Sequence, residues 1–510
     1  MAFPGILKTD LMSAAVRFMK RFPRPQSVLR IILPVLVLSL ARAQTAPNHA
    51  AQAASALRNE QYDKALELLS VALKESPGNA QLLTMQGVAY AKLSRKKEAL
   101  ASFRQAIKIT PNNIPALQGA AQIEYDNGSA SGIPILEHLL QLRRDDLTSR
   151  GMLAVLEYQQ GNCPRAVKHF ERAASLFDRQ PQALHAYGTC LAKLKRFDDS
   201  AVVLGKSLAL NPDDQRERHV LASVQLMAHS PETALITLGP LLGSNPDAAT
   251  LELASAAYEA AHDTEKAVDA LRQAILLDPH NANLYVDFAA LASTHQSFDV
   301  GINVVNDGIH LLPEAAPLYF ARGMLYVQLA EYDKSEADFE KAYELDPSQS
   351  LTVAAQGLAA VQRNDLSRAL SDVQQKLDRK PDDPILLYVQ ADVLTQQGAT
   401  PDSPEFQTAL RSAKKAVALR PSLGPARSVL AKLYLQAGQY LEAAVQCRKA
   451  LEINPKDQTA LYHLIQALRK TEKKGEIPDL LKRLAQLRQE ATKDEREQYR
   501  YKLVEGDTQK

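Results

Sequence analysis

Three cysteines have the most reactive side chains of this chain, and their spacing limits the chemistry that they can do. Cys163, Cys190 and Cys447 form no CxxC pair, and the eleven histidines form no cluster with the spacing of metal ligands. Cys163 and Cys190 could form a disulfide in an oxidising compartment. The alternative, which we favour from the sequence, is that all three cysteines are small apolar core residues.

Other patterns that carry catalytic chemistry are missing from the sequence. It contains no GxSxG, no HExxH and no glycine-rich phosphate loop. The acids Asp198, Asp199 and Glu442 stand at expected helix starts, where a negative charge is favourable. We therefore predict no catalytic residue, no metal site and no cofactor, and we predict that the chain is not an enzyme.

The elements that position these residues are indicated by a proline that recurs at a fixed interval. Most intervals are 33 or 34 residues, one is 40, and one of 101 is close to three periods. The recurring residues are Pro77, Pro111, Pro212, Pro246, Pro279, Pro313, Pro347, Pro381, Pro421 and Pro455. A fixed period of this length indicates one supersecondary unit that is repeated along the chain.

One copy, residues 80–113, indicates what the unit is. Apolar or small residues recur at spacings of three and four on both sides of residues 93–95, which predicts two amphipathic helices joined by a turn. Small and aromatic residues stand at set places in this copy, namely Gly87, Tyr90, Ala99, Phe103 and Ala106, before the closing Pro111. Other copies repeat this arrangement, for example with Gly323, Tyr326, Phe339, Ala342 and Pro347.

This arrangement resembles the tetratricopeptide repeat (TPR) family. The resemblance implies an all-α fold, a right-handed superhelical solenoid of about 12–13 TPR helical hairpins over residues 45–490. Two segments depart from the period, residues 127–132 and residues 397–404, and we expect a loose turn in the first and an extended inter-helix loop in the second. Residues 491–510 are predicted to be a charged C-terminal helix and tail.

The proline itself has a local role, because it cannot continue a helix and so ends the second helix of each unit. Polar residues follow it closely, and their side chains can accept hydrogen bonds from the free N–H groups at the start of the next helix. These expected caps are Asn113, Asp213, Asp247, Asn281, Ser348 and Asp382.

Residues 1–43 look like a secretory signal peptide. Basic residues precede an apolar run from Ile31 to Leu40, and Ala41-Arg42-Ala43 offers small residues for cleavage near Ala43. The run is short for a membrane span, which needs about 20 apolar residues. We expect an extracytoplasmic protein, periplasmic or secreted, with no membrane span after cleavage, although a leader that is kept as an anchor stays possible at this point.

The formal charge also depends on this segment. Residues 1–43 hold seven of the 60 Lys and Arg residues but one of the 58 acids, so the remaining chain has a net charge of −4 instead of +2. Basic residues and aromatics are not clustered together, so nucleic acid is not an expected partner.

The TPR resemblance implies that the first helix of each repeat lines a concave groove that binds protein or peptide segments. We predict a contact patch of Phe320, Met324, Val327, Leu358, Val361 and Tyr388. The alternative is that these apolar residues pack between neighbouring first helices.

The expected function is a non-enzymatic protein-binding scaffold outside the cytoplasm, by family analogy in an envelope or secretion assembly. The alternatives are a regulatory or carrier subunit of an envelope enzyme complex, such as one for polysaccharide synthesis, and a cytosolic co-chaperone. The lysine and asparagine residues with which some relatives bind a terminal carboxylate are missing, which disfavours the co-chaperone.

Overall fold

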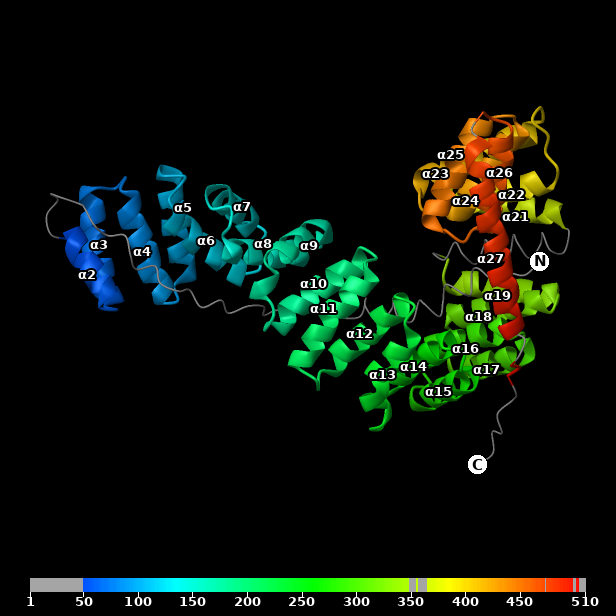
Figure 1. Ribbon diagram of the computed structural model, residues 1–510, viewed down its shortest axis with the longest axis horizontal. Coiled ribbons are helices and arrows are strands. Elements are labelled where there is room, and N and C mark those ends of the chain that lie inside the picture. Colours follow the sequence, from blue (N-terminus) through cyan, green and yellow to red (C-terminus); the bar gives the residue numbers. More distant parts are fainter. Residues whose placement is uncertain (1–48, 348–354, 356–364, 473, 499–500, 504–510) are drawn as a thin grey trace. The chain divides into compact units, whose positions relative to one another are not determined.

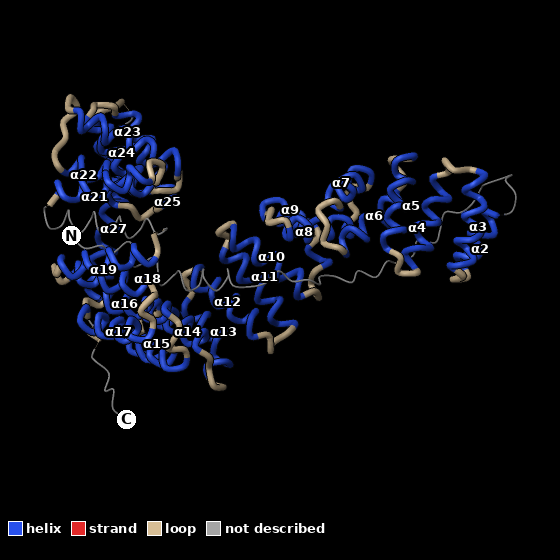
Figure 2. Tube along the Cα trace, turned by 180° about the vertical axis from the view of Figure 1, so that it is seen from behind, coloured by secondary structure: helices blue, strands red, loops and turns tan. Residues whose placement is uncertain are grey.

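The chain folds as pairs of antiparallel helices, as the proline period predicts. A computed structural model describes residues 49–347, 355, 365–472, 474–498 and 501–503. Over these residues there are 25 α-helices, two short 3-10 helices and no strand (Figure 2). The prediction of an all-α repeat fold is thus confirmed, whereas the predicted signal peptide lies outside the described residues.

The helices divide into two compact units between Gly243 and Ser244. The N-terminal unit contains six hairpins in the described residues (Figure 1). Its helices are α2 (His49–Arg58), α3 (Tyr62–Glu75), α4 (Ala80–Lys92), α5 (Lys96–Ile109), α6 (Ile114–Asp126), α7 (Gly132–Leu142), α8 (Leu147–Gln159), α9 (Cys163–Arg172), η1 (Ala174–Leu176), α10 (Pro181–Lys193), α11 (Phe197–Leu210), α12 (Gln215–Met227) and α13 (Pro231–Leu242).

The C-terminal unit continues the same pattern and ends on a longer helix. Its helices are α14 (Ala248–Ala260), α15 (Thr264–Leu277), α16 (Ala282–Thr294), α17 (Phe298–Leu311), α18 (Ala316–Gln328), α19 (Tyr332–Leu345), α21 (Leu366–Arg379), α22 (Pro384–Gln396), α23 (Pro404–Leu419), α24 (Gly424–Gln436), α25 (Tyr440–Ile453), α26 (Gln458–Arg469), η2 (Lys474–Glu476) and α27 (Ile477–Gln498). The inserted residues after α22 lie in the link to α23, as expected.

Glycine lets the two helices of a hairpin approach closely where an aromatic ring fills the space between them. A Cβ atom on Gly87 would lie 2.6 Å from the ring of Phe103, and one on Gly323 would lie 2.7 Å from the ring of Phe339. Both rings are buried, with exposed fractions of 1% and 0%. The small and aromatic residues of the repeat pattern are therefore packing partners across these two hairpins.

The recurring proline also accepts hydrogen bonds, a role that the sequence did not indicate. At four junctions its carbonyl oxygen accepts a hydrogen bond from a side chain in the first turn of the next helix, six residues further along. The donor and acceptor pairs are Tyr285 to Pro279 (2.9 Å), Tyr319 to Pro313 (3.0 Å), Arg218 to Pro212 (2.6 Å) and Arg427 to Pro421 (2.8 Å). The junction between successive repeats is thus fixed by a polar contact as well as by packing.

The expected helix caps are partly confirmed. Asn113, Asp247 and Asn281 accept hydrogen bonds from N–H groups of the first turn that follows. At two other starts the cap is one residue later than predicted, at Asp214 and Asp383. At these two starts the first residue after the proline, Asp213 or Asp382, lies in the turn, so its side chain is too early to reach the free N–H groups. Ser348 lies outside the described residues.

The last helix is longer than the sequence indicated. The charged C-terminal helix and tail were expected to begin at residue 491, whereas α27 is one continuous helix from Ile477 to Gln498. Leu484 is buried in a cluster with Leu461 and Ile465 of α26. Residues 488–493, by contrast, are exposed.

Candidate protein-binding surface

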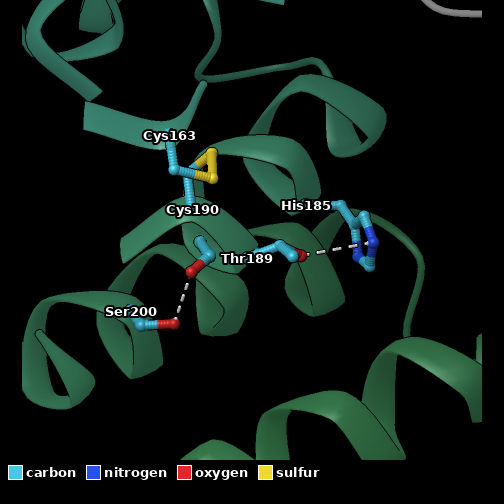
Figure 3. Close-up of a disulfide and its surroundings, with 6 residues drawn as sticks. Cys163, His185, Thr189, Cys190 and Ser200 are labelled. Carbon is cyan, nitrogen blue, oxygen red and sulfur yellow. Dashed lines mark hydrogen bonds between the residues drawn. A yellow bond between two sulfur atoms is a disulfide. The ribbon is translucent and has the colours of Figure 1, made fainter. Parts of the chain in front are cut away.

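Polar side chains meet on three first helices of the N-terminal unit, α8, α10 and α12. Asp214 caps α12 by accepting from the backbone N–H of Glu217 at 3.0 Å, which fixes this residue in the first turn. The Glu217 carboxylate then reaches back to α10, where its Oε2 lies 2.6 Å from His185 Nδ1. One turn further along α10, Thr189 Oγ1 lies 3.4 Å from His185 Nε2 (Figure 3).

The Glu217 carboxylate is buried, but only one of its two oxygen atoms has a hydrogen-bond partner among the described residues. The residue is 7% exposed, and its Oε1 has no hydrogen-bond partner among the described residues. Burial, and then the charge of Glu217, raise the pKa of the nearby Tyr158 hydroxyl of α8. An acceptor that is buried without a partner costs free energy, so a donor supplied from outside would be bound favourably.

The other members of this cluster are accessible. The His185 side chain is 26% exposed, and Tyr158 and Thr189 are partly exposed. We define Tyr158, His185, Thr189 and Glu217 as the α10 cluster. Its chemistry suits a basic side chain or a backbone N–H group of a bound segment.

A disulfide also involves α10, the helix that carries His185 and Thr189. Cys163, the first residue of α9, is bonded to Cys190 of α10, and the two Cα atoms are 4.9 Å apart (Figure 3). Our preference for unpaired core cysteines was therefore wrong for this pair. The first helix of one hairpin packs closely on the second helix of the preceding hairpin, which brings the two residues together. Cys447, in contrast, is a buried free thiol.

The predicted contact patch contains both buried and partly exposed residues in the structure. Met324 and Val327 of α18 are 1% and 4% exposed and pack with Phe339 in a buried cluster that Phe320 partly covers. Tyr388 of α22 is partly buried, and its pKa is raised mainly by that burial. Leu358 and Val361 lie outside the described residues. That this patch contacts a partner stays a prediction, and of its described members Phe320 and Tyr388 keep accessible surface.

Two further properties concern the described part of the chain alone. It contains no group of three or more His, Cys, Asp or Glu side chains that could hold a metal ion. No helix in that part is both long enough and apolar enough to cross a membrane.

Sequence patterns do not mark the α10 cluster, because its histidine belongs to no group with the spacing of metal ligands and Glu217 stands near a helix start like many other acids. The signal was available in the period, because residues 185 and 217 stand near the starts of first helices in adjacent repeats. In the structure these two side chains meet across a repeat junction.

Comparisons with known proteins agree with this architecture. Sequence models described as tetratricopeptide repeat match residues 50–114, 152–214 and 354–417, and residues 316–349 and 425–457, just over half of the chain in total. The chain is similar to human Tetratricopeptide repeat protein 13, with 25% identity over 219 residues, and to Superkiller protein 3 of Schizosaccharomyces pombe, with 21% identity over 178 residues.

These matches are partial. They cover 41% and 33% of this chain, and 24% and 13% of the two relatives, so the chain spans a quarter or less of their length. Among solved structures, yeast Tom70 is similar at a TM-score of 0.41 with 18% identity, over 89% of this chain and 95% of that one.

Proposed function

Because the chain belongs to the tetratricopeptide repeat family, whose repeats form protein-interaction scaffolds, we propose that it is a non-enzymatic scaffold that captures peptide or helix segments on its first helices. We place its action outside the cytoplasm, in an envelope or secretion assembly. The observation that carries the capture of a segment is the unsatisfied Glu217 oxygen in the α10 cluster.

The bound segment would complete this cluster. A lysine, arginine or backbone N–H donor next to Glu217 Oε1 would satisfy the buried acceptor, and His185 already holds the other oxygen. The accessible parts of His185 and Thr189 would contact the rest of the segment. This arrangement favours a basic or extended segment over an acidic one.

The proposed location has two supports. One is the signal-peptide pattern of residues 1–43, and the other is the Cys163–Cys190 disulfide. Disulfides persist in oxidising compartments and are rare where glutathione and thioredoxin keep thiols reduced. Alkylation of thiols in freshly lysed host cells would test the location, because an extracytoplasmic chain would expose one thiol on unfolding and a cytoplasmic chain three.

Photo-crosslinking in the native host tests the capture. A photoreactive residue in place of Gln182, which is exposed on α10, leaves His185 and Glu217 intact. We expect a discrete crosslinked protein from this position, and a loss of about tenfold or more in its yield when Glu217→Gln removes the charge-assisted contact.

The matched control is the same photoreactive residue in place of Val202, which is 64% exposed on the second helix α11. Equal crosslinking from Val202, or a product that Glu217→Gln leaves unchanged, would rule out capture at the α10 cluster. Circular dichroism of the Glu217→Gln protein checks that the repeat fold is retained.

A further inference from the structure

A short segment near the end of the chain lies on the repeats of the C-terminal unit. Helix α27, red in Figure 1, leads from α26 towards this segment, and residues 488–493 on the way are exposed. Tyr501–Leu503 lies outside any helix, and Leu503 is buried, with an exposed fraction of 4%. An exposed stretch followed by a buried leucine indicates a specific contact, because an unattached charged tail would leave leucine in water.

The contact uses backbone and side-chain groups together. The backbone N–H of Leu503 donates to Ser297 Oγ at 2.8 Å, in a buried hydrogen bond. Two residues earlier, the Tyr501 ring meets the His295 ring edge-on, with centroids 6.2 Å apart. Tyr501 and Leu503 thus make the contacts, while Lys502 between them is exposed.

The receiving surface is formed by the turn between α16 and α17 and by the neighbouring hairpin. His295, in that turn, is 3% exposed. Its Nε2 lies 2.9 Å from Glu259 Oε1 of α14 and 3.3 Å from Thr264 Oγ1 of α15. The ring that Tyr501 contacts is therefore held in place by two other helices. Burial, and then the charges of Glu265 and Asp269 on α15, raise the pKa of Tyr501, which agrees with its position against that helix.

Ser297 Oγ can accept a hydrogen bond from the segment because it does not cap α17, the helix that follows it. It is the N-cap residue of α17, but its side chain accepts no cap hydrogen bond. Ser230 has the same place before α13, also without a cap hydrogen bond, and both hydroxyls donate weakly to the carbonyl two residues earlier. The two serines thus have the same local geometry, and they differ in that Ser297 holds Leu503.

We propose that this surface, made by Glu259, Thr264, His295 and Ser297, is a recognition site for an extended segment of a partner protein that carries tyrosine, any residue, then leucine. The chain's own Tyr501–Leu503 is the competing occupant, so a partner segment of the same chemistry must displace it. The proposal goes beyond the capture at the α10 cluster and does not depend on it, because the two sites lie in different units.

The docked segment Tyr501–Leu503 is short, which favours its displacement by a partner segment. Among the described residues, it is held by a backbone hydrogen bond, a ring contact and a buried leucine, and residues 488–493 are exposed. A tethered segment acts at about millimolar effective concentration, so with a dissociation constant of about 100 μM for the free segment the tail would weaken partner binding about tenfold. Such a contact lowers the affinity of a partner without blocking the site permanently.

The test measures binding of a fluorescein-labelled peptide with the sequence of residues 498–506 to the full chain, by fluorescence anisotropy. The variant Tyr501→Ser with Leu503→Ser opens the site. We expect the peptide to bind this variant about tenfold more tightly than the unaltered chain, and an alanine-flanked Tyr-Lys-Leu peptide to bind similarly. A peptide in which the leucine is replaced by aspartate should not bind.

Single serine changes in the opened chain test the surface itself. Ser297→Ala should weaken peptide binding about three- to tenfold, because it removes one buried hydrogen bond, whereas the matched Ser230→Ala should leave it unchanged. Equal peptide affinity for the opened and unaltered chains would overturn the proposal. So would a large fall in the melting temperature of the opened chain without peptide binding, which would identify Tyr501–Leu503 as a structural cap.

Discussion

The Cys163–Cys190 disulfide should contribute several kcal/mol to the stability of the N-terminal unit. The two residues are separated by 27 positions in the sequence. Closing a loop of that length removes conformational entropy from the unfolded chain that is equivalent to about 3.5 kcal/mol at 25 °C. The bond joins α9 of one hairpin to α10 of the next, so its loss weakens a repeat junction near the middle of the unit.

Reduction of the unaltered chain and the double change Cys163→Ala with Cys190→Ala should have the same effect. For a unit of this size, a loss of about 3.5 kcal/mol corresponds to a fall of about 10 °C in the melting temperature. Circular dichroism during heating, with and without dithiothreitol, measures it. Cys447→Ala is the matched control, because its thiol is buried and free, so its response to reductant should equal that of the unaltered chain.

Two results would refute this reasoning. One is a melting temperature that reductant shifts by less than about 2 °C, which would mean that the folded junction alone sets the stability. The other is titration of three thiols in the oxidised, unfolded chain, because the disulfide leaves only Cys447 to react.

Three more predictions concern packing and protonation. Gly87→Ala should destabilise the N-terminal unit by about 1–3 kcal/mol, since its Cβ would overlap an aromatic ring, whereas Gly205→Ala, with nothing within 4 Å of the new Cβ, should stabilise it by up to about 1 kcal/mol in denaturant titrations. Burial, and then neighbouring cations, lower the pKa of His169 to about 4. As the pH falls, the unfolded chain therefore protonates this histidine before the folded chain does. The free energy of unfolding should decrease as the pH drops from about 6.5 to about 4, and it should decrease less steeply in His169→Gln. Met324→Glu should cost at least about 3 kcal/mol and reduce helix content by circular dichroism, because it buries an unpaired charge, while Phe320→Glu at the partly exposed neighbouring position should cost much less.

The hairpins could be predicted from the sequence because their determinants are local and repeated. The proline period fixed where second helices end, and the pairing of Gly87 with Phe103 follows from the places of small and aromatic residues within one unit. The exact helix boundaries could not be predicted in this way, as the shift of the cap from Asp213 to Asp214 illustrates. A one-residue difference in a turn leaves the hydrophobic period unchanged, so the pattern cannot resolve it.

The polar contacts between repeats could not be predicted in the same way. His185 and Glu217 meet because two first helices lie next to each other, and nothing in either local sequence marks the pair. Cys163 and Cys190 were considered, but their pairing depends on the distance between two helices. The contact of Leu503 with Ser297 joins residues 206 positions apart and follows no period, so it became visible only in the structure.

Because Leu503 follows Ser297 by 206 positions, the surface is synthesised before the segment that covers it. A ribosome that adds about 5–20 residues per second needs about 10–40 s to proceed from Ser297 to Leu503. For most of that time, once α17 has been made as far as Leu311, the hairpins that contain Glu259, Thr264 and His295 are complete, while Tyr501 and Leu503 are still unmade. A partner segment that is present then meets an open surface, whereas one that arrives after synthesis must compete with the tail, so the same two proteins would associate at different rates depending on the age of the chain.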